Sequence, residues 1–212
     1  MSGGAFEDRR DRMVDRLVES GRIGDEATID ALRSVPRHEF VPAPKRDAAY
    51  VDRPLPIGDD QTISAPHMVG MMTELIDAEP GDVVLEIGTG CGYHAAVTAE
   101  VVGSENVYSV EYSECLAERA EDTLSDLGYG DVSIRVGDGW DGWPEHAPYD
   151  RAYLTCAATE LPEPVAEQVV GGGRILAPIG RRQQMLKQFD KRADGSLATE
   201  SHGGVRFVQM RG

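Results

Sequence analysis

Apolar and polar segments alternate along this chain in a way that predicts strands and helices in turn. The run from Val83 to Ile87 is almost entirely apolar, which is typical of a parallel strand that is covered on both faces. We expect this strand at about 83–87 and further strands at about 106–110, 131–136, 149–155 and 173–178. Helices are expected at about 66–77, 92–102, 113–127 and 161–170. Such alternation predicts a mostly parallel sheet with helices on both of its faces.

The two ends of the chain carry other patterns. Residues 6–20 gather Phe6, Met13, Leu17 and Val18 toward one stripe amid charges, and Asp25 can cap a second helix that runs to Val35, so we expect two surface helices. Segments 185–190 and 205–209 predict two antiparallel strands joined across Asp194-Gly195 and a polar loop. The expected architecture is a three-layer α/β/α sandwich with a mostly parallel sheet, an antiparallel C-terminal edge and an N-terminal helical extension.

The segment Gly81–Tyr93, GDVVLEIGTGCGY, predicts a buried strand that runs into a glycine-rich turn. Gly88, Gly90 and Gly92 remove side chains where a ligand would approach the backbone. The spacing G-x-G-x-G behind Glu86 differs from the dinucleotide fingerprint G-x-G-x-x-G, and it favours S-adenosylmethionine over NAD. A glycine-rich turn with a purely structural role is the alternative.

Acidic residues follow the first three strands of this predicted sheet. Glu111 lies about 20 residues beyond the glycines, where a carboxylate can accept hydrogen bonds from ribose hydroxyls. Asp138, between Gly137 and Gly139, can reach an adenine amino group. Taken singly, Glu111 could be a solvated acid and Asp138 a turn residue, but the three acids Glu86, Glu111 and Asp138 in strand order favour a nucleoside site.

Charge and length limit the remaining possibilities. The 212 residues carry a net charge of −16, and only three of the 21 basic residues are lysines. Such a surface is tolerated in molar salt, where charges are screened within about 3 Å, so we expect a halophilic source; an ordinary acidic protein from a GC-rich genome is the alternative. We expect a single domain over 1–212, with a helical and active-site segment at 1–65 and the core at 66–212.

Several partners and locations are disfavoured by the sequence. Nucleic acid is a poor partner for so acidic a surface, and no apolar run approaches the roughly 18 residues of a membrane span. With no secretory signal pattern at its N-terminus, the chain is expected to be cytoplasmic. Cys91, Cys115 and Cys156 lack disulfide or zinc spacing, and Cys91 with His94 has no second pair to complete a metal site. We expect free thiols and no metal.

Four longer blocks carry a family resemblance. VPRHEFVP at 35–42, VDRPLPIGDDQTISAPHM at 51–68, VLEIGTGCGYHAAV at 84–97 and GDGWDGWPEHAPYD at 137–150 occur in order along nearly the whole chain. Together they resemble protein-L-isoaspartate O-methyltransferase, an enzyme that repairs isomerised aspartyl residues. The resemblance implies a Rossmann-like methyltransferase fold, S-adenosylmethionine as methyl donor with S-adenosylhomocysteine as product, and isoaspartyl-containing damaged proteins and peptides as substrates. We also expect a monomer.

The resemblance implies roles for individual residues. Ser64 occupies the position of the active-site serine, which would act by positioning the substrate. Substrate contacts are expected from Thr62, Ile63, Ser64 and His67. Cofactor contacts are expected from Gln61, Thr62, Ile63, Ser64, Glu86, Gly88, Gly90, Cys91, Glu111, Tyr112, Asp138 and Gly139.

The chain departs from its relatives at three points. Val69 replaces a histidine and Cys91 a serine that several relatives carry, so a histidine contact and a hydrogen bond to the cofactor are expected to be lost or weakened. The chain stops at Gly212, before an extension that closes the site in some members, which leaves the closing wall to other residues. A methyltransferase of RNA or metabolites and a noncatalytic binding module remain the alternatives; neither the Asn/Asp-Pro-Pro-aromatic motif nor a basic stripe is present.

Overall fold

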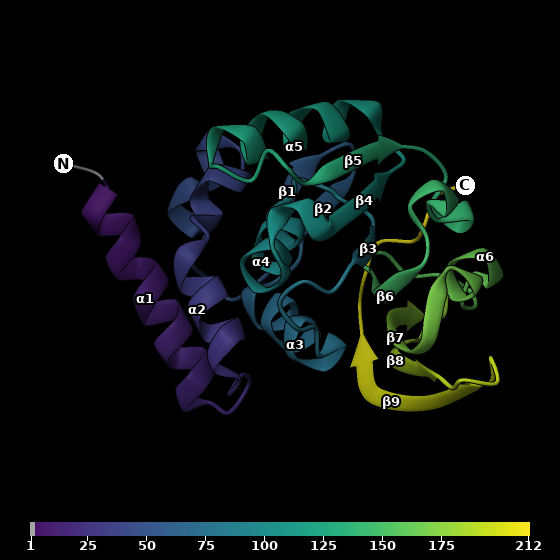
Figure 1. The fold of residues 1–212 in the computed structure, drawn as a ribbon. Helices are drawn as coiled ribbons and strands as arrows, with labels where there is room; N and C mark the ends of the chain where they lie inside the picture. Colours follow the sequence, from purple (N-terminus) through teal and green to yellow (C-terminus); the bar gives the residue numbers. More distant parts are fainter. Residues whose placement is uncertain (1–2) are drawn as a thin grey trace.

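The computed structural model describes residues 3–212, and its centre is a seven-stranded sheet with the order β5-β4-β3-β6-β7-β8-β9 (Figure 1). The strands are β3 (Val84–Ile87), β4 (Val107–Glu111), β5 (Ser133–Val136), β6 (Tyr149–Leu154), β7 (Val169–Ile179), β8 (Gln184–Lys191) and β9 (Leu197–Val205). Strands β3 to β7 pair in parallel, whereas β8 and β9 are antiparallel. The predicted α/β fold with a mostly parallel sheet and an antiparallel C-terminal edge is confirmed.

Helices cover the two faces of this sheet unequally. One face is covered by α3 (Pro66–Ile76), α4 (Tyr93–Val102) and α5 (Glu114–Asp126), and the other by the short α6 (Glu163–Glu167) with the 3₁₀ turns Gly139–Asp141 and Pro144–His146. Side chains of β3 point alternately to the two faces, as the period of a strand requires. Val84 belongs to the core under the long helices, while Leu85 and Ile87 belong to the core on the opposite side.

The N-terminal extension packs outside α3 and α4, as the purple and blue helices of Figure 1 show. It comprises α1 (Gly3–Glu19), α2 (Glu26–Ser34) and the 3₁₀ helices η1 (Arg37–Phe40) and η2 (Ala43–Ala48). The expected Asp25 cap is present, since its carboxylate accepts a hydrogen bond from the Thr28 amide at 2.8 Å. Val14 is buried in the apolar stripe of α1, whereas Val18 is 39% exposed. Val14 therefore takes the place of Val18 in the predicted stripe.

Two local predictions were wrong. The helix expected at 161–170 is only the five residues of α6, because the β-branched pair Val169-Val170 already enters β7 and three glycines follow. The expected strand at 205–209 is instead β9, which pairs directly across a tight turn, with Lys191 opposite Leu197. Polar residues are tolerated in β9 because it is an exposed edge strand.

A short hairpin precedes α3. Strands β1 (Leu55–Gly58) and β2 (Gln61–Ile63) pair antiparallel, with Leu55 opposite Ile63. Leu55, Ile57 and Ile63 are buried, so the hairpin shows the apolar alternation of a strand that has one covered face. The hairpin leads directly into Ser64 and the start of α3.

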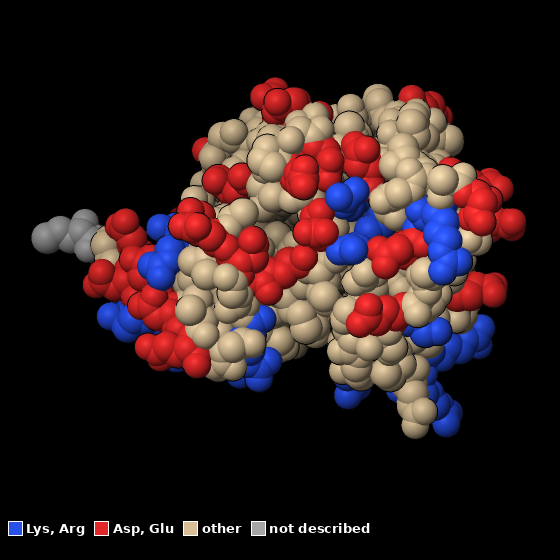
Figure 2. Space-filling view, turned by 60° about the horizontal axis from the view of Figure 1, so that its bottom comes forward, with Lys and Arg blue, Asp and Glu red and all other residues tan. Residues whose placement is uncertain are grey.

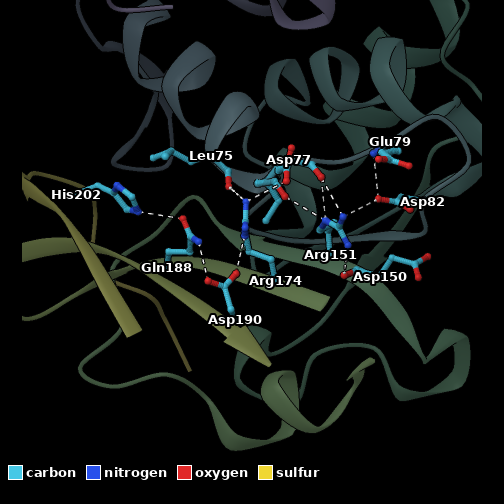
Figure 3. A network of polar contacts seen from close by, with 11 residues as sticks. Leu75, Asp77, Glu79, Asp82, Asp150, Arg151, Arg174, Gln188, Asp190 and His202 are labelled. Carbon is cyan, nitrogen blue, oxygen red and sulfur yellow. Dashed lines mark hydrogen bonds and ion pairs between the residues drawn. The ribbon is translucent and has the colours of Figure 1, made fainter. Parts of the chain in front are cut away.

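Two arginines of the sheet hold the C-terminal end of α3 (Figure 3). Arg151 on β6 donates to the carbonyl oxygens of Ile76 and Asp77, both at 3.1 Å, and Arg174 on β7 donates to the Leu75 carbonyl at 3.0 Å. These donors satisfy carbonyl groups that a helix leaves unpaired in its last turn. The network fixes the end of α3 that lies away from Ser64.

Candidate active site

A cavity opens at the carboxyl edge of the parallel strands, where open α/β sheets bind ligands. The space in and around it, including open solvent at its mouth, is about 770 Å³. Its wall includes the end of the β1–β2 hairpin, the glycine-rich loop after β3, the ends of β4 and β6, and the C-terminal segment. Of the predicted site residues, it is lined by Gln61, Thr62, Ile63, Ser64, Glu86, Gly88, Gly90, Cys91, Glu111, Tyr112 and Gly139.

The glycine-rich loop turns sharply away from β3 and presents its backbone to the cavity. Gly88 has φ +100°, a left-handed conformation that other residues rarely adopt. A Cβ atom at this position would collide with Thr155 Oγ1, and this hydroxyl itself donates to the Gly88 carbonyl. Glycine is therefore required here both by conformation and by space.

Glu111 joins this loop to the end of β4. Its carboxylate accepts hydrogen bonds from the amides of Gly90 at 2.8 Å and Ser113 at 2.9 Å, one on each oxygen. Each carboxylate oxygen can accept more than one hydrogen bond. The side chain lines the cavity while it fixes the loop, so it retains capacity for donors of a ligand.

Glu86 is a buried acid with half of its carboxylate unused. It is 0% exposed, and its Oε2 accepts from the Ser109 hydroxyl at 2.5 Å, while Oε1 has no partner among the described residues. Burial raises the pKa of Glu86 to about 8, although the hydroxyl groups of Ser109 and Tyr153 act in the opposite direction. A ligand group that donates a hydrogen bond or carries positive charge would complete this carboxylate.

Asp138 and Gly139 lie beside the end of β5. The Asp138 carboxylate accepts from the Trp140 amide at 2.9 Å, which is the turn role that the sequence left open for it. Asp138 itself is not among the residues that line the cavity, whereas Gly139 is. A side chain at Gly139 would collide with Ile87 and Met210, so this turn must approach β3 closely.

Ser64 lies between the hairpin and α3, and it does not cap the helix. The N-cap of α3 is Ala65, which makes no side-chain cap hydrogen bond, so a capping role for Ser64 is not observed. The Ser64 carbonyl instead accepts a hydrogen bond from the guanidinium of Arg37 at 2.7 Å. Arg37 was not among the predicted site residues, although it belongs to the VPRHEFVP block.

Two histidines lie near this region in different surroundings. His67 is in the first turn of α3, where its Nδ1 lies 2.7 Å from Asp52, and it does not line the cavity. His94, which the sequence analysis did not select, does line the cavity and is 6% exposed. Burial lowers the pKa of His94 to about 3, so this ring is neutral near pH 7.

The C-terminal segment supplies the wall that the sequence left unassigned. Val208, Gln209, Met210 and Arg211 line the cavity. The Ala157 amide donates to the Val208 carbonyl at 2.8 Å, and Arg211 pairs with Asp59 of the β1–β2 hairpin at 2.9 Å. No pattern in the sequence singled out this segment, because it is neither helix nor strand and contacts the cavity through tertiary packing.

The cysteines of the site are not arranged for nucleophilic or metal chemistry. Burial raises the pKa of the Cys156 thiol to about 12, so it is not a thiolate near pH 7. Within residues 3–212 no three acidic, cysteine or histidine side chains are placed to hold a metal ion. In the same range, no helix is both long and apolar enough to cross a membrane.

Comparisons with known proteins agree on one family. The family model described as "Protein-L-isoaspartate(D-aspartate) O-methyltransferase" matches residues 8–212. Protein-L-isoaspartate O-methyltransferase 2 of Archaeoglobus fulgidus is 49% identical over 208 residues, covering 98% of this chain and 94% of the relative. The protein-L-isoaspartate O-methyltransferase of Methanothermobacter thermautotrophicus is 47% identical, with coverage of 97% and 96%.

Solved structures give the same picture. A protein-L-isoaspartate O-methyltransferase has a TM-score of 0.88 at 33% identity, and the match covers 96% of this chain and 66% of that one. A putative protein-L-isoaspartate O-methyltransferase from Plasmodium falciparum, solved in complex with S-adenosyl-L-homocysteine, has a TM-score of 0.83 at 21% identity. That match covers 95% of this chain and 98% of that one.

Proposed function

The chain belongs to the protein-L-isoaspartate O-methyltransferase family, and we propose below how its residues perform the family reaction. The enzyme uses S-adenosylmethionine to methylate the α-carboxylate of L-isoaspartyl residues in damaged proteins and peptides. The neighbouring backbone nitrogen then displaces the ester alcohol to close a succinimide without further catalysis. Hydrolysis of the succinimide returns part of the residue to normal aspartate.

The residues around the cavity fit the methyl donor. S-adenosylmethionine supplies, when bound, an electrophilic methyl group on a positively charged sulfur. Glu86 offers an unpaired buried oxygen that suits a cationic or donating group, and the backbone at Gly88 and Gly90 lies open to the cavity. We assign the ribose side to Glu111 and Tyr112, and the adenine side to Gly139 with Asp138 next to it, just outside the cavity lining. Cys91 is assigned to the contacts between the glycine-rich loop and the methyl donor.

Substrate positioning is assigned to the segment before α3. Near neutral pH a free carboxylate is already ionised, because the reference pKa of the α-carboxyl is about 3.3–3.7. The reaction therefore needs alignment of the attacking oxygen rather than a general base. Ser64 would hydrogen-bond the isoaspartyl carboxylate, with Gln61, Thr62 and Ile63 beside it and His67 in the first turn of α3, outside the cavity lining. The observation that carries this assignment is that residues 61–64 and the glycine-rich loop line one cavity.

The direct test of the function is transfer of labelled methyl from S-adenosylmethionine to an L-isoaspartyl peptide, beside its normal aspartyl twin. We expect base-labile label on the isoaspartyl peptide alone. Label on both peptides, or on neither despite cofactor binding, would reject the substrate assignment.

The same assay in low and multimolar KCl tests a halophilic origin. Acidic side chains spread over the face drawn in Figure 2, most densely over the N-terminal helices, and the net charge is −16. We expect activity and stability to rise with KCl, because about 1 M salt screens repulsion between surface acids beyond about 3 Å. Full activity and an unchanged melting temperature in low salt would contradict this origin. We propose in addition that the source is haloarchaeal and that the protein is cytoplasmic. We also propose that it is a monomer that binds neither nucleic acid nor membranes.

Replacing Ser64 with alanine tests its positioning role. We expect kcat/KM for the isoaspartyl peptide to fall by about 10–100-fold, since loss of one hydrogen bond to a charged group costs about 1.5–3 kcal/mol. Binding of S-adenosylhomocysteine, followed by calorimetry, should change little. A Ser64→Ala enzyme with wild-type kinetics would remove Ser64 from the mechanism.

A further inference from the structure

Arg37 is a fully buried arginine next to the active-site segment. It lies on η1, and its exposed fraction is 0%. Its Nε donates to the Ala49 carbonyl at 2.8 Å and one terminal nitrogen donates to the Ser64 carbonyl at 2.7 Å. The other terminal nitrogen, Nη1, is buried without a partner among residues 3–212. Arg37 therefore holds the backbone at Ser64 and keeps one donor unused.

The same guanidinium packs against the helix that follows the glycine-rich loop. Its central carbon lies 4.8 Å from the centre of the Tyr93 ring, which is the geometry of a cation–π contact. Tyr93 is the first residue of α4 and lines the cavity, as Ser64 does. One buried side chain thus links the substrate segment to the start of the helix behind the cofactor loop.

This positive charge lacks an acidic counterpart within the structure. Among residues 3–212 no salt bridge involves Arg37, and the groups that act on its charge are the tyrosines Tyr93 and Tyr50 and the thiol of Cys91. An unpaired buried charge costs several kcal/mol in a protein interior. The hydrogen bonds to Ala49 and Ser64 and the Tyr93 ring offset part of this cost, and a negative charge in the neighbouring cavity would offset more of it.

The isoaspartyl carboxylate would bring a negative charge to this site. Glu111 lines the cavity and the chain carries a net charge of −16, so the surroundings otherwise disfavour an anionic substrate. In a low-dielectric interior a charge acts over several ångströms with little screening. Arg37 is hydrogen-bonded to the backbone of Ser64, the residue to which the isoaspartyl carboxylate is assigned, although Arg37 itself does not line the cavity.

We propose that Arg37 is a positioning residue for the isoaspartyl carboxylate: it fixes the Ser64 backbone against α4 and provides positive potential that draws the carboxylate to Ser64. This inference rests on the function assigned above. Arg37 acts through Ser64 and through its field, without contact with the reacting atoms. We therefore expect a larger effect on the peptide substrate than on the methyl donor.

Two substitutions separate the two parts of this role. Arg37→Gln removes charge and geometry together, whereas Arg37→Lys keeps the charge but loses the planar fork that serves two carbonyls. We expect Arg37→Gln to raise the peptide KM and lower kcat, with kcat/KM reduced by about 10–100-fold, since small misplacements of reacting groups cost up to about 100-fold. Arg37→Lys should restore KM to within about threefold and leave kcat low. The Kd of S-adenosylhomocysteine should stay within about threefold in both variants, which is a change of at most about 0.7 kcal/mol in binding free energy.

Arg151→Gln is the matched control. Arg151 also donates to backbone carbonyls that flank α3, but at the opposite end of the helix (Figure 3). This variant should lower the melting temperature and leave peptide kcat and KM unchanged. The kinetics are compared below the melting temperatures of all variants. If the Arg37 variants also keep the peptide kcat and KM of the wild type, Arg37 is only a structural residue and the proposal fails.

Amide hydrogen exchange supplies a readout that does not depend on activity. We expect faster exchange in residues 61–69 of Arg37→Lys, and in the region around residues 76–82 of Arg151→Gln. If the amides of residues 61–69 exchange as slowly in Arg37→Lys as in the wild type, Arg37 does not fix the backbone at Ser64. A wild-type enzyme that methylates no isoaspartyl peptide would reject the assigned function instead, and the exchange comparison would still decide the contact.

Discussion

Replacing Gly88 with alanine is expected to abolish measurable binding of S-adenosylhomocysteine. The left-handed conformation at φ +100° costs an L-residue about 1–2 kcal/mol. The new methyl group also collides with Thr155 Oγ1, and overpacking of this kind costs about 1–3 kcal/mol. The loop can relieve the strain only by moving from its position over the cavity. A shift worth about 4 kcal/mol corresponds to about 1,000-fold in affinity.

Gly81→Ala is the control for this substitution. Gly81 precedes β3 and has φ +91°, but a Cβ atom there meets nothing within 4 Å. The control should therefore lose about 1–2 kcal/mol of stability from conformation alone and bind the product normally. Calorimetric titration and thermal denaturation of both variants make the comparison. Equal affinities in the two variants would show that the backbone at Gly88 does not form the cofactor site.

The parts of the site that could be predicted from the sequence are formed by local structure. The apolar run of β3, the glycines behind it and Glu111 at the end of β4 follow from strand burial and turn conformation. Each of these properties is decided within a few residues of the chain. Parallel strands then bring their carboxyl ends to one edge of the sheet, so the residues converge without any need to know the tertiary packing.

The remaining parts depend on contacts between distant segments. Arg37 reaches Ser64 across 27 positions, and Arg211 reaches Asp59 across 152. No local period or spacing encodes such pairs. β9 was misplaced for a related reason, because an edge strand exposed to solvent lacks the apolar alternation by which strands are recognised. The family resemblance supplied Ser64 but did not reveal what holds it.

Glu86→Gln is expected to change the pH dependence of stability by several kcal/mol. The Glu86 side chain is 0% exposed, and burial raises its pKa to about 8. In the unfolded chain a glutamate has a pKa of about 4.3. Between these two values the folded protein holds a proton that the unfolded chain has released. Stability therefore falls as the pH rises from about 5 to 8, and it is greatest below the unfolded pKa.

Glutamine has no proton to lose, so it should remove this slope. The free energy of unfolding of Glu86→Gln, relative to the wild type, should increase by on the order of 4 kcal/mol between pH 5 and 8. Urea denaturation at several pH values measures the difference, in which the contributions of all other titrating groups cancel. Parallel curves for the two proteins across this range would mean that Glu86 is ionised in the folded enzyme.

The same substitution, Glu86→Gln, should weaken binding of the product S-adenosylhomocysteine. An ionised Glu86 can accept a hydrogen bond from a positively charged amino group through its unpaired Oε1, so binding of S-adenosylhomocysteine should release a proton below about pH 8. The glutamine oxygen can accept the Ser109 hydrogen bond only if the NH₂ donors of the amide point toward the positively charged amino group of the ligand. We expect Glu86→Gln to bind the product at least about tenfold more weakly, a loss of about 1.4 kcal/mol. Calorimetry in buffers of different ionisation enthalpy should detect proton release in the wild type and none in the variant. A variant that is more stable at pH 8 but binds more weakly would show that the unpaired oxygen of Glu86 is kept for the ligand at the expense of the fold.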